Sequence, residues 1–231
     1  MTENAKADAE PTTLRLSLDT KATVAVGPFS RKGENRVLTK AADHDFKPTA
    51  TVTPVGILLP KEAELFLYMT TSKVTSDCLV DCLSACWEML RPRFPTVTTL
   101  ALNLDNGPES HSRRTQFMGR IVRFVQDFQI TVRLAYYPPY HSKYNPIERC
   151  WGILERHWNG ALLDSVEAVF NFAGSMTWKG THPVVAQLAT IYSSGVKLSA
   201  KAMASLEAQI HRLPGLEKWF VDISPDTVWK A

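Results

Sequence analysis

Short stretches of alternating or β-prone residues mark the strands of this chain, because a period of two is typical of a half-buried strand. We predict strands at 14–20, 22–27, 64–70, 97–105 and 130–136. The clearest example ends at Asp105, where the turn formers Asn106, Gly107 and Pro108 stop an alternating run.

Apolar residues spaced three or four apart predict the helices. We expect them at 77–89, 112–127 and 145–158. The segment 28–60 mixes Gly, Pro and charged residues before it turns apolar, so we interpret it as a long hairpin or insertion. Residues 1–13 are polar and predict a disordered tail.

The order of these elements predicts an α/β protein. Three early strands can pair as an antiparallel meander, whereas each later strand needs a helical crossover to lie parallel. This order matches the ribonuclease-H-like fold, a mixed sheet flanked by helices, and we expect it over 14–180. Residues 181–231 carry two helical patterns, one over 182–192 and one capped by Ser199, and predict a C-terminal helical appendage. For these two helices, an ordinary hairpin is favoured over a DNA-reading helix-turn-helix.

Three acidic residues stand where strands and a helix would present them. Asp19 lies on the first strand and Asp105 ends the fourth. Glu148 lies in the first turn of the last helix, for which we expect Asn145 as the N-cap and Pro146 as the first helical residue. Because open α/β sheets bind ligands at the carboxyl ends of their strands, the set predicts a shared site. Structural alternatives stay open: a solvated strand residue for Asp19, an Asx-turn for Asp105 and a capping box for Glu148.

The order Asp19, Asp105, Glu148 resembles the Asp-Asp-Glu triad of the transposase and retroviral-integrase superfamily. The segment 138–148 is similar to the third motif of insertion-sequence transposases. More closely, four segments are similar to the Rhodopirellula-type DDE transposase family: 19–22 (Asp-Thr-Lys-Ala), 41–46 (Ala-Ala-Asp-His-Asp-Phe), 105–109 (Asp-Asn-Gly-Pro-Glu) and 182–185 (His-Pro-Val-Val). The resemblance runs from about Leu14 to Ile223.

This resemblance implies the catalytic domain of a DNA transposase from a mobile element, which cleaves phosphodiester bonds and transfers strands during transposition and recombination. It implies that Asp19, Asp105 and Glu148 are catalytic and bind metal. Clustered carboxylates need a cation, and hard oxygen ligands suit Mg²⁺ or Mn²⁺, here two ions. Rival carboxylates are Asp43, Asp45 and Glu109.

Basic and aromatic residues near the triad are candidates for contacting DNA, both transposon ends and target. They are Lys21, Arg113, Arg114, His141, Lys143, Tyr144 and Arg149. Such groups position the phosphate backbone without reading sequence. The net charge is only +3, so a DNA surface would be a local patch. A solvated helix face is the alternative for each arginine.

The composition is that of an ordinary globular protein, with 231 residues, 45% hydrophobic and 21% charged. No apolar run has the length of a membrane span and no signal peptide is evident, so we expect a cytoplasmic protein, associated with the nucleoid when bound to DNA. Cys78, Cys82 and Cys86 recur every four residues, which favours core packing over a metal site.

One departure from the resembled family concerns the N-terminus. Full transposases of this type carry a DNA-binding region before the first catalytic Asp, whereas 18 residues precede Asp19 here. We therefore expect an isolated catalytic domain, a truncated copy or one product of a split gene, acting as a homo-oligomer or with a partner transposase subunit. Two other functions stay open: an inactive or regulatory DNA-binding relic of a transposase, and a ribonuclease-H-like nuclease or resolvase.

Overall fold

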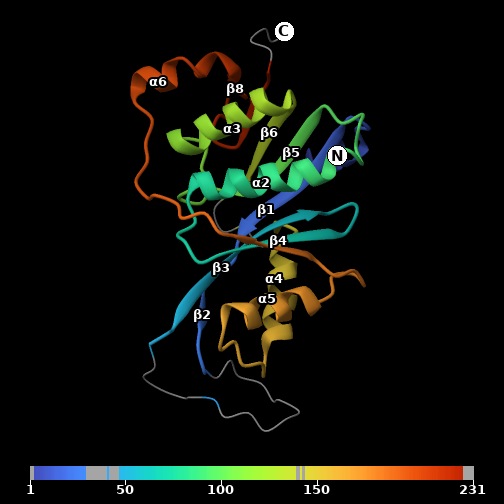
Figure 1. Ribbon diagram of the computed structural model, residues 1–231. Helices are drawn as coiled ribbons and strands as arrows, with labels where there is room; N and C mark the ends of the chain where they lie inside the picture. Colours follow the sequence, from blue (N-terminus) through green and yellow to red (C-terminus); the bar gives the residue numbers. More distant parts are fainter. Residues whose placement is uncertain (1–2, 30–40, 42–46, 139–140, 142–143, 226–231) are drawn as a thin grey trace.

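The computed structural model describes residues 3–29, 41, 47–138, 141 and 144–225. Within these ranges the chain forms a nine-stranded sheet with helices on both sides (Figure 1). The strands are β1 (Thr13–Thr20), β2 (Val24–Val26), β3 (Ala50–Leu59), β4 (Glu64–Thr70), β5 (Thr99–Asp105), β6 (Thr131–Tyr137), β7 (Val184–Leu188), β8 (Ile210–Arg212) and β9 (Phe220–Ile223). The helices are α1 (Glu3–Ala9), α2 (Ser76–Leu90), α3 (Thr115–Phe128), α4 (Glu148–Trp158), α5 (Val166–Ser175), α6 (Ala200–Ala204) and the 3₁₀ turn η2 (Glu207–Gln209).

Strand β1 lies at the centre of the sheet, whose order is β7-β4-β3-β1-β5-β6-β9-β8, with β2 paired to β3 beside this path. It pairs antiparallel with β3 and parallel with β5, and β5 is in turn parallel with β6. The carboxyl ends of β1, β5 and β6 therefore meet at one edge of the sheet. This confirms the predicted α/β class and its mixed sheet.

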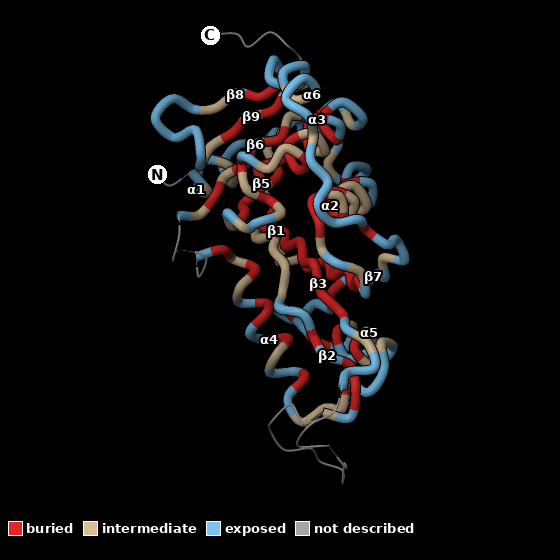
Figure 2. Tube along the Cα trace, turned by 90° about the vertical axis from the view of Figure 1, so that its left-hand side faces the viewer, coloured by how far each residue is buried: buried red, intermediate tan, exposed pale blue. Residues whose placement is uncertain are grey.

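The two faces of β1 meet different partners because successive side chains point to opposite sides of a strand. Leu14, Leu16 and Leu18 are buried in the larger core, together with α2 and α3. Ser17 and Asp19 face the other side, where α4 packs. Figure 2 shows the layers, with α1 and α4 on one side of the buried strands and α2 and α3 on the other.

Helices α2 and α3 form for reasons that the sequence shows. Thr75 caps α2 by accepting a hydrogen bond from the Cys78 amide at 3.4 Å, and the apolar stripes of both helices turn to the sheet. Cys78, Cys82 and Cys86 are fully buried in this core, so the predicted packing of the cysteine stripe is confirmed. Each fully buried Leu or Phe of these stripes contributes about 1.5–3 kcal/mol relative to exposure.

The N-terminal prediction is wrong, because residues 3–9 are helical and docked. Arg15 on β1 donates two hydrogen bonds of 2.7 Å to the Asp8 carboxylate, and the Asn4 amide donates to the Tyr137 hydroxyl at 3.3 Å. Helix α1 has no buried residue. Polar contacts with the sheet therefore hold α1. Because no apolar face of this helix is buried, its sequence shows no apolar periodicity.

The early meander also differs from its prediction in one strand. Its middle member is β3, from the segment interpreted as a hairpin or insertion, while 22–27 yields only the short β2, paired with β3. Most of β3 is buried on both faces. A strand buried on both faces loses the polar alternation that marks a half-buried strand.

The C-terminal region differs most from its prediction. Residues 184–188, expected in a helix, form β7 parallel to β4, and β9 pairs with β6 on the opposite side of the sheet. Ser199 caps α6 as predicted, but this helix is only five residues long. The segment from 181 onward thus completes both edges of the sheet, and a helix-turn-helix is ruled out for its described part.

Helix α5 fills a stretch for which the sequence predicted no element, and it packs with α4 in a second apolar core that includes Trp158 and Val169. None of the helices in the described ranges combines the length and apolar character that a membrane span requires.

Candidate active site

Asp19 lies on the central strand and is held by helix α4. The Trp151 indole Nε1 donates a hydrogen bond of 2.8 Å to Asp19 Oδ2. Burial raises the pKa of Asp19 to about 6, the Trp151 bond opposes this increase, and the charges of Asp105 and Glu148 add to it. Asp19 is therefore a carboxylate that the fold keeps close to two others and partly out of water.

A glycine on the neighbouring strand permits this contact. Gly56 of β3 pairs with Asp19, and a Cβ built on it would lie 2.5 Å from the Trp151 ring and 2.7 Å from Ile147 Cδ1. Both distances are shorter than real Cβ contacts, so only glycine lets α4 approach this closely. The missing side chain at Gly56 thus sets the position of the helix that begins with Glu148.

Asp105 ends β5, next to the end of β1. Burial raises its pKa, and the nearby Asn145 amide lowers it. Among the described residues, Asp105 Oδ1 and Asn145 Nδ2 are buried atoms without a hydrogen-bond partner, so the amide acts here as a nearby dipole. A buried carboxylate oxygen without a partner has lost its hydration without gaining a hydrogen bond. This desolvation is costly unless a cation or a hydrogen-bond donor binds the oxygen.

Asn145 does not cap α4, contrary to the prediction. The helix begins at Glu148, its N-cap position is Ile147, and no side chain caps it. Asn145 is fully buried, and its Oδ1 accepts a hydrogen bond from the Ser17 hydroxyl, which itself accepts from the Ile147 amide at 3.3 Å. Asn145 therefore joins the start of α4 to the centre of β1, and the capping-box alternative for Glu148 is wrong.

Glu148 occupies the first turn of α4 and is partly exposed. Burial raises its pKa, the charge of Asp105 adds to this, and Lys21 opposes it. The charge of Asp105 thus raises the pKa of Glu148, and the charges of Asp105 and Glu148 raise the pKa of Asp19. The three predicted carboxylates therefore interact electrostatically across β1, β5 and α4. The structure brings them to one region at the edge of the sheet.

The carboxylates do not form a closed ligand set. Within the described residues, no three His, Cys, Asp or Glu side chains lie close enough together to hold a metal ion. The chemistry of the donors nevertheless suits a hard cation, because Asp105 offers a buried oxygen without a partner and all three pKa values are raised. Mg²⁺ usually takes one or two carboxylates and completes its shell with water and substrate phosphate, so a complete protein cage is not required.

A cleft of about 630 Å³ opens beside this group. Asp19 and Asp105 are among the residues that line it, and the loop 107–110 forms part of its wall. Glu109, a rival carboxylate in the sequence, lies in this wall and pairs with Arg114 at 3.0 Å. Asp43 and Asp45, the other rivals, lie outside the described residues.

Two of the predicted DNA-binding cations are engaged within the protein. Lys21 Nζ lies 2.7 Å from Glu155 on α4 and 5.7 Å from the centre of the Trp158 ring, and Arg114 pairs with Glu109. Arg113 and Arg149 are exposed.

The aromatic candidates lie before α4. The rings of His141 and Tyr144 stack with centroids 5.7 Å apart, and Tyr144 is 60% exposed. Lys143 lies outside the described residues. The two rings thus offer a flat, accessible surface on the approach to Glu148, which is the kind of surface on which bases stack.

Sequence reasoning missed Ser17, Gly56, Asn145 and Trp151 as residues that build the site. Ser17 had a signal, because it shares a strand face with Asp19 two positions later. No sequence signal marked Gly56. Its role is to leave room for α4 beside a strand that lies 37 positions away from Asp19 in the sequence.

The sequence model of the family described as Rhodopirellula transposase DDE domain matches residues 1–225 of this chain. The chain belongs to this family. The match includes both strand carboxylates, the start of α4 and the C-terminal strands, so the resemblance found in the sequence is confirmed.

Similarity to one solved structure supports the fold of this DDE domain. A crystal structure of the Mos1 mariner paired-end complex with Mn has a TM-score of 0.50 at 8% identity, covering 73% of this chain and 49% of that one. A Mos1 transposase paired-end complex with the left transposon end has a TM-score of 0.49 at 12% identity, with 73% and 48% covered. The chain thus spans about half the length of these transposases. The similarity to the complex with Mn supports the ribonuclease-H-like fold alone. A comparison with curated proteins finds no match.

Proposed function

We propose that this DDE domain is the catalytic domain of a transposase that cleaves phosphodiester bonds at transposon ends and transfers the strands to target DNA. The observation that carries the proposal is the meeting of Asp19, Asp105 and Glu148 at one sheet edge, with each pKa raised. Partly buried carboxylates that repel one another are costly for a fold, and such perturbed groups beside a cleft cluster at functional sites.

The same three carboxylates would hold Mg²⁺ or Mn²⁺. Two such ions would supply Lewis acidity and charge neutralisation for the attacking and leaving oxygens of a phosphodiester displacement. Trp151 would fix Asp19 Oδ2, so that Asp19 presents its other oxygen to the site. Asn145, tied to Ser17, would orient Asp105, and Lys21 would offset part of the negative charge near Glu148.

The partner of this site would be DNA, bound with a second copy of the chain or with a partner transposase subunit. The support is family membership together with the exposed Arg113, Arg149, His141 and Tyr144 around the carboxylates. The Mos1 structures are described as paired-end complexes, one of them with a transposon end. Such a protein would work at the nucleoid in the cytoplasm.

The test uses Glu148→Gln, which preserves size and removes the charge. Wild-type protein is expected to melt at a higher temperature in Mn²⁺ than in EDTA, because a ligand stabilises only the state that binds it. The variant is expected to lose most of this shift and to lose cleavage of DNA that carries the element's ends. Wild-type cleavage and an unchanged Mn²⁺ shift in Glu148→Gln would return Glu148 to a structural role.

The products of the wild-type reaction distinguish the proposal from its alternatives. Strands joined to target DNA support a transposase. Products that are cut but never joined support a nuclease or resolvase of the same fold. Binding without either product supports a regulatory relic, and that result would overturn the catalytic proposal.

A further inference from the structure

The loop that follows Asp105 is held by side chains from two other elements. Ser76, the first residue of α2, donates a hydrogen bond of 2.7 Å to the Glu109 carbonyl oxygen. Tyr136 on β6 donates one of 2.6 Å from its hydroxyl to the Ser110 carbonyl oxygen. Both acceptors belong to the backbone, so these contacts fix the course of the loop itself and do not depend on its side chains.

The contact from Tyr136 continues back to Asp105 through Ser110. The Ser110 hydroxyl donates a hydrogen bond of 3.0 Å to the Asp105 carbonyl oxygen. The direction of this carbonyl depends on the ψ angle of Asp105, one of the two soft backbone angles of the residue. On its other side, Asp105 pairs with Tyr137 in the ladder between β5 and β6. The backbone of Asp105 is therefore held both by the ladder and by Ser110.

The Tyr136 hydroxyl is not needed to fill the core. Tyr136 is 5% exposed and lies with Leu104, its partner on β5, in the apolar core under α2 and α3. A phenylalanine ring would occupy almost the same volume. Burial raises the pKa of this hydroxyl above its usual range, so it keeps its proton and remains a donor. Buried hydroxyls are hydrogen-bonded, and this one is bound to the loop after Asp105.

The Asp105 carboxylate depends on its backbone for its position. Asp19 Oδ2 is held by the Trp151 indole, whereas Asp105 Oδ1 is buried without a hydrogen-bond partner among the described residues. No donor therefore holds this oxygen in place, and its position follows from where the end of β5 lies. A contact that fixes the end of β5 thus also fixes the oxygen.

We propose that Tyr136 is a positioning residue for Asp105, acting through Ser110 to fix the place where the Asp105 carboxylate meets a divalent cation. The inference rests on the proposed function, which assigns Asp105 to the metal site. Groups that orient a metal ligand from behind change metal affinity by about ten- to hundredfold when they are removed. The alternative is that the Tyr136 hydroxyl only satisfies itself in the core, in which case its loss would lower stability alone.

Binding of Mn²⁺ to the DNA-free protein separates these two roles without a cleavage reaction. The loss of the EPR signal of free Mn²⁺ measures the bound fraction. Tyr136→Phe removes one oxygen and keeps the ring, and we expect it to raise the dissociation constant for Mn²⁺ about tenfold.

The matched control is Tyr192→Phe. Tyr192 is 8% exposed, and its hydroxyl donates a hydrogen bond of 2.9 Å to Asp81 on α2, not to the loop. Both variants should melt at a lower temperature in EDTA, because each loses the hydrogen bond of a buried hydroxyl. Only Tyr136→Phe should also bind Mn²⁺ more weakly.

A double-mutant cycle tests whether the effect passes through Ser110. Ser110→Ala removes the hydroxyl that holds the Asp105 carbonyl but keeps the backbone acceptor of Tyr136. It should weaken Mn²⁺ binding by a similar factor. The combined variant should bind Mn²⁺ no more weakly than either single variant, because the two changes interrupt the same link. Factors that multiply in the combined variant would show that the two residues act independently and would exclude the link.

Amide hydrogen exchange gives a measurement that needs no metal. In EDTA, residues 105–112 should exchange faster in Tyr136→Phe than in wild type or Tyr192→Phe. Unchanged exchange, or Mn²⁺ binding as tight as in Tyr192→Phe, would overturn the inference. A wild-type protein that binds no Mn²⁺ would instead refute the metal site of the proposed function, and the exchange rates would then decide by themselves whether Tyr136 positions Asp105.

Discussion

The two faces of strand β1 show how one alternating sequence provides both a core and a site. Leu14, Leu16 and Leu18 enter the apolar core under α2 and α3. Ser17 and Asp19, which lie between and after them, meet Asn145 and Trp151 from the start of α4. The first face needs only apolar groups of suitable volume, whereas each polar group on the second face needs a specific hydrogen-bond partner.

This difference has an energetic origin. Apolar contact is non-directional and scales with buried area, so many sequences fill such a core. A buried polar group loses its hydration and recovers it only through a partner with correct geometry. The α4 face is therefore the one that depends on Gly56, whose bare backbone lets Trp151 reach Asp19.

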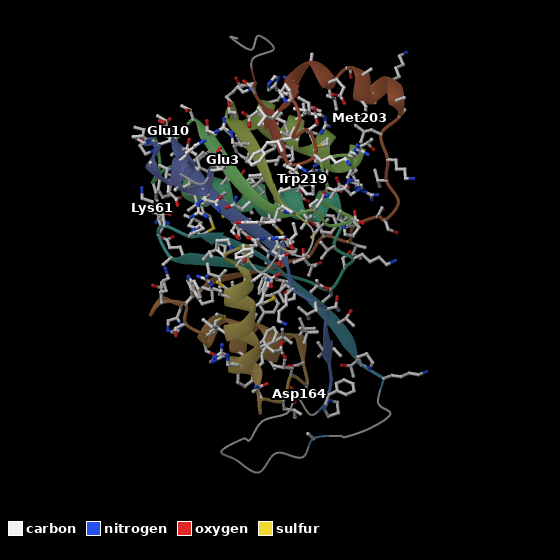
Figure 3. The ribbon with its side chains drawn as sticks, turned by 180° about the vertical axis from the view of Figure 1, so that it is seen from behind. Glu3, Glu10, Lys61, Asp164, Met203 and Trp219 are labelled. Carbon is white, nitrogen blue, oxygen red and sulfur yellow. The ribbon has the colours of Figure 1, made fainter. Side chains whose placement is uncertain are left out.

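The largest expected effect is on catalysis at the polar face. Asp105→Asn should lower the rate of divalent-dependent DNA cleavage by about a thousandfold or more, because it removes a charged ligand from the proposed metal site. The fold should survive, which circular dichroism would check. Asp164→Asn is the matched control, since Asp164 is exposed at the end of the molecule opposite Met203 (Figure 3). Full activity in Asp105→Asn would remove this residue from the catalytic set.

The next effect is on stability at the apolar face. Leu102→Ala on β5 should lower the free energy of unfolding by about 2–5 kcal/mol, because it opens a cavity in the core under α2 and α3. Leu102→Met, which nearly conserves volume, should cost less than about 1.5 kcal/mol. Urea denaturation measures both. Equal costs for the two variants would contradict the view that volume alone governs this face.

A substitution at Gly56 should have a smaller effect on stability and should also change the active site. Gly56→Ala should cost about 1–3 kcal/mol by overpacking against Trp151 and Ile147, and it should also reduce cleavage by shifting Glu148. Gly152→Ala on α4 is the control, because an added Cβ there would meet no neighbouring atom within 4 Å. It should stabilise the protein by up to about 1 kcal/mol, since alanine favours a helix over glycine. Unfolding curves and cleavage rates of both proteins give the comparison, and a silent Gly56→Ala would show that α4 tolerates displacement.

The smallest expected effect is a pH-dependent gain in stability. The pKa of Asp19 is raised from 3.8 to about 6, so its charge destabilises the metal-free fold fully above pH 6, and this cost declines as the pH falls from 6 toward 3.8. Asp19→Asn should therefore stabilise the protein in EDTA by about 1–2 kcal/mol at pH 8 and by almost nothing near pH 4. Thermal unfolding at several pH values measures the gain. A gain of the same size at every pH would mean that charge is not its cause.

Where the chain alternates or repeats with a clear period, the sequence was a reliable guide. The strands containing Asp19 and Asp105, the helices α2 and α3 and the buried cysteine stripe all follow from local patterns, because each element has one buried face. Patterns failed for β3, which is buried on both faces, and for β7, a short edge strand with no strong period. They failed also for α1, which polar contacts hold.

The sequence alone determined which chemical groups this protein possesses and in what order: the two strand carboxylates, the glutamate after a proline-rich segment and the family to which they belong. Only the tertiary structure decided how these groups meet. Asn145 became a buried link between β1 and α4, Trp151 became a donor to Asp19, and residues of β1, β3, α2 and the loops after β4 and β5 came to line one cleft. The physical reason is that local periodicity records which side of an element is buried, whereas hydrogen-bond partners and close approaches depend on residues far away in the sequence.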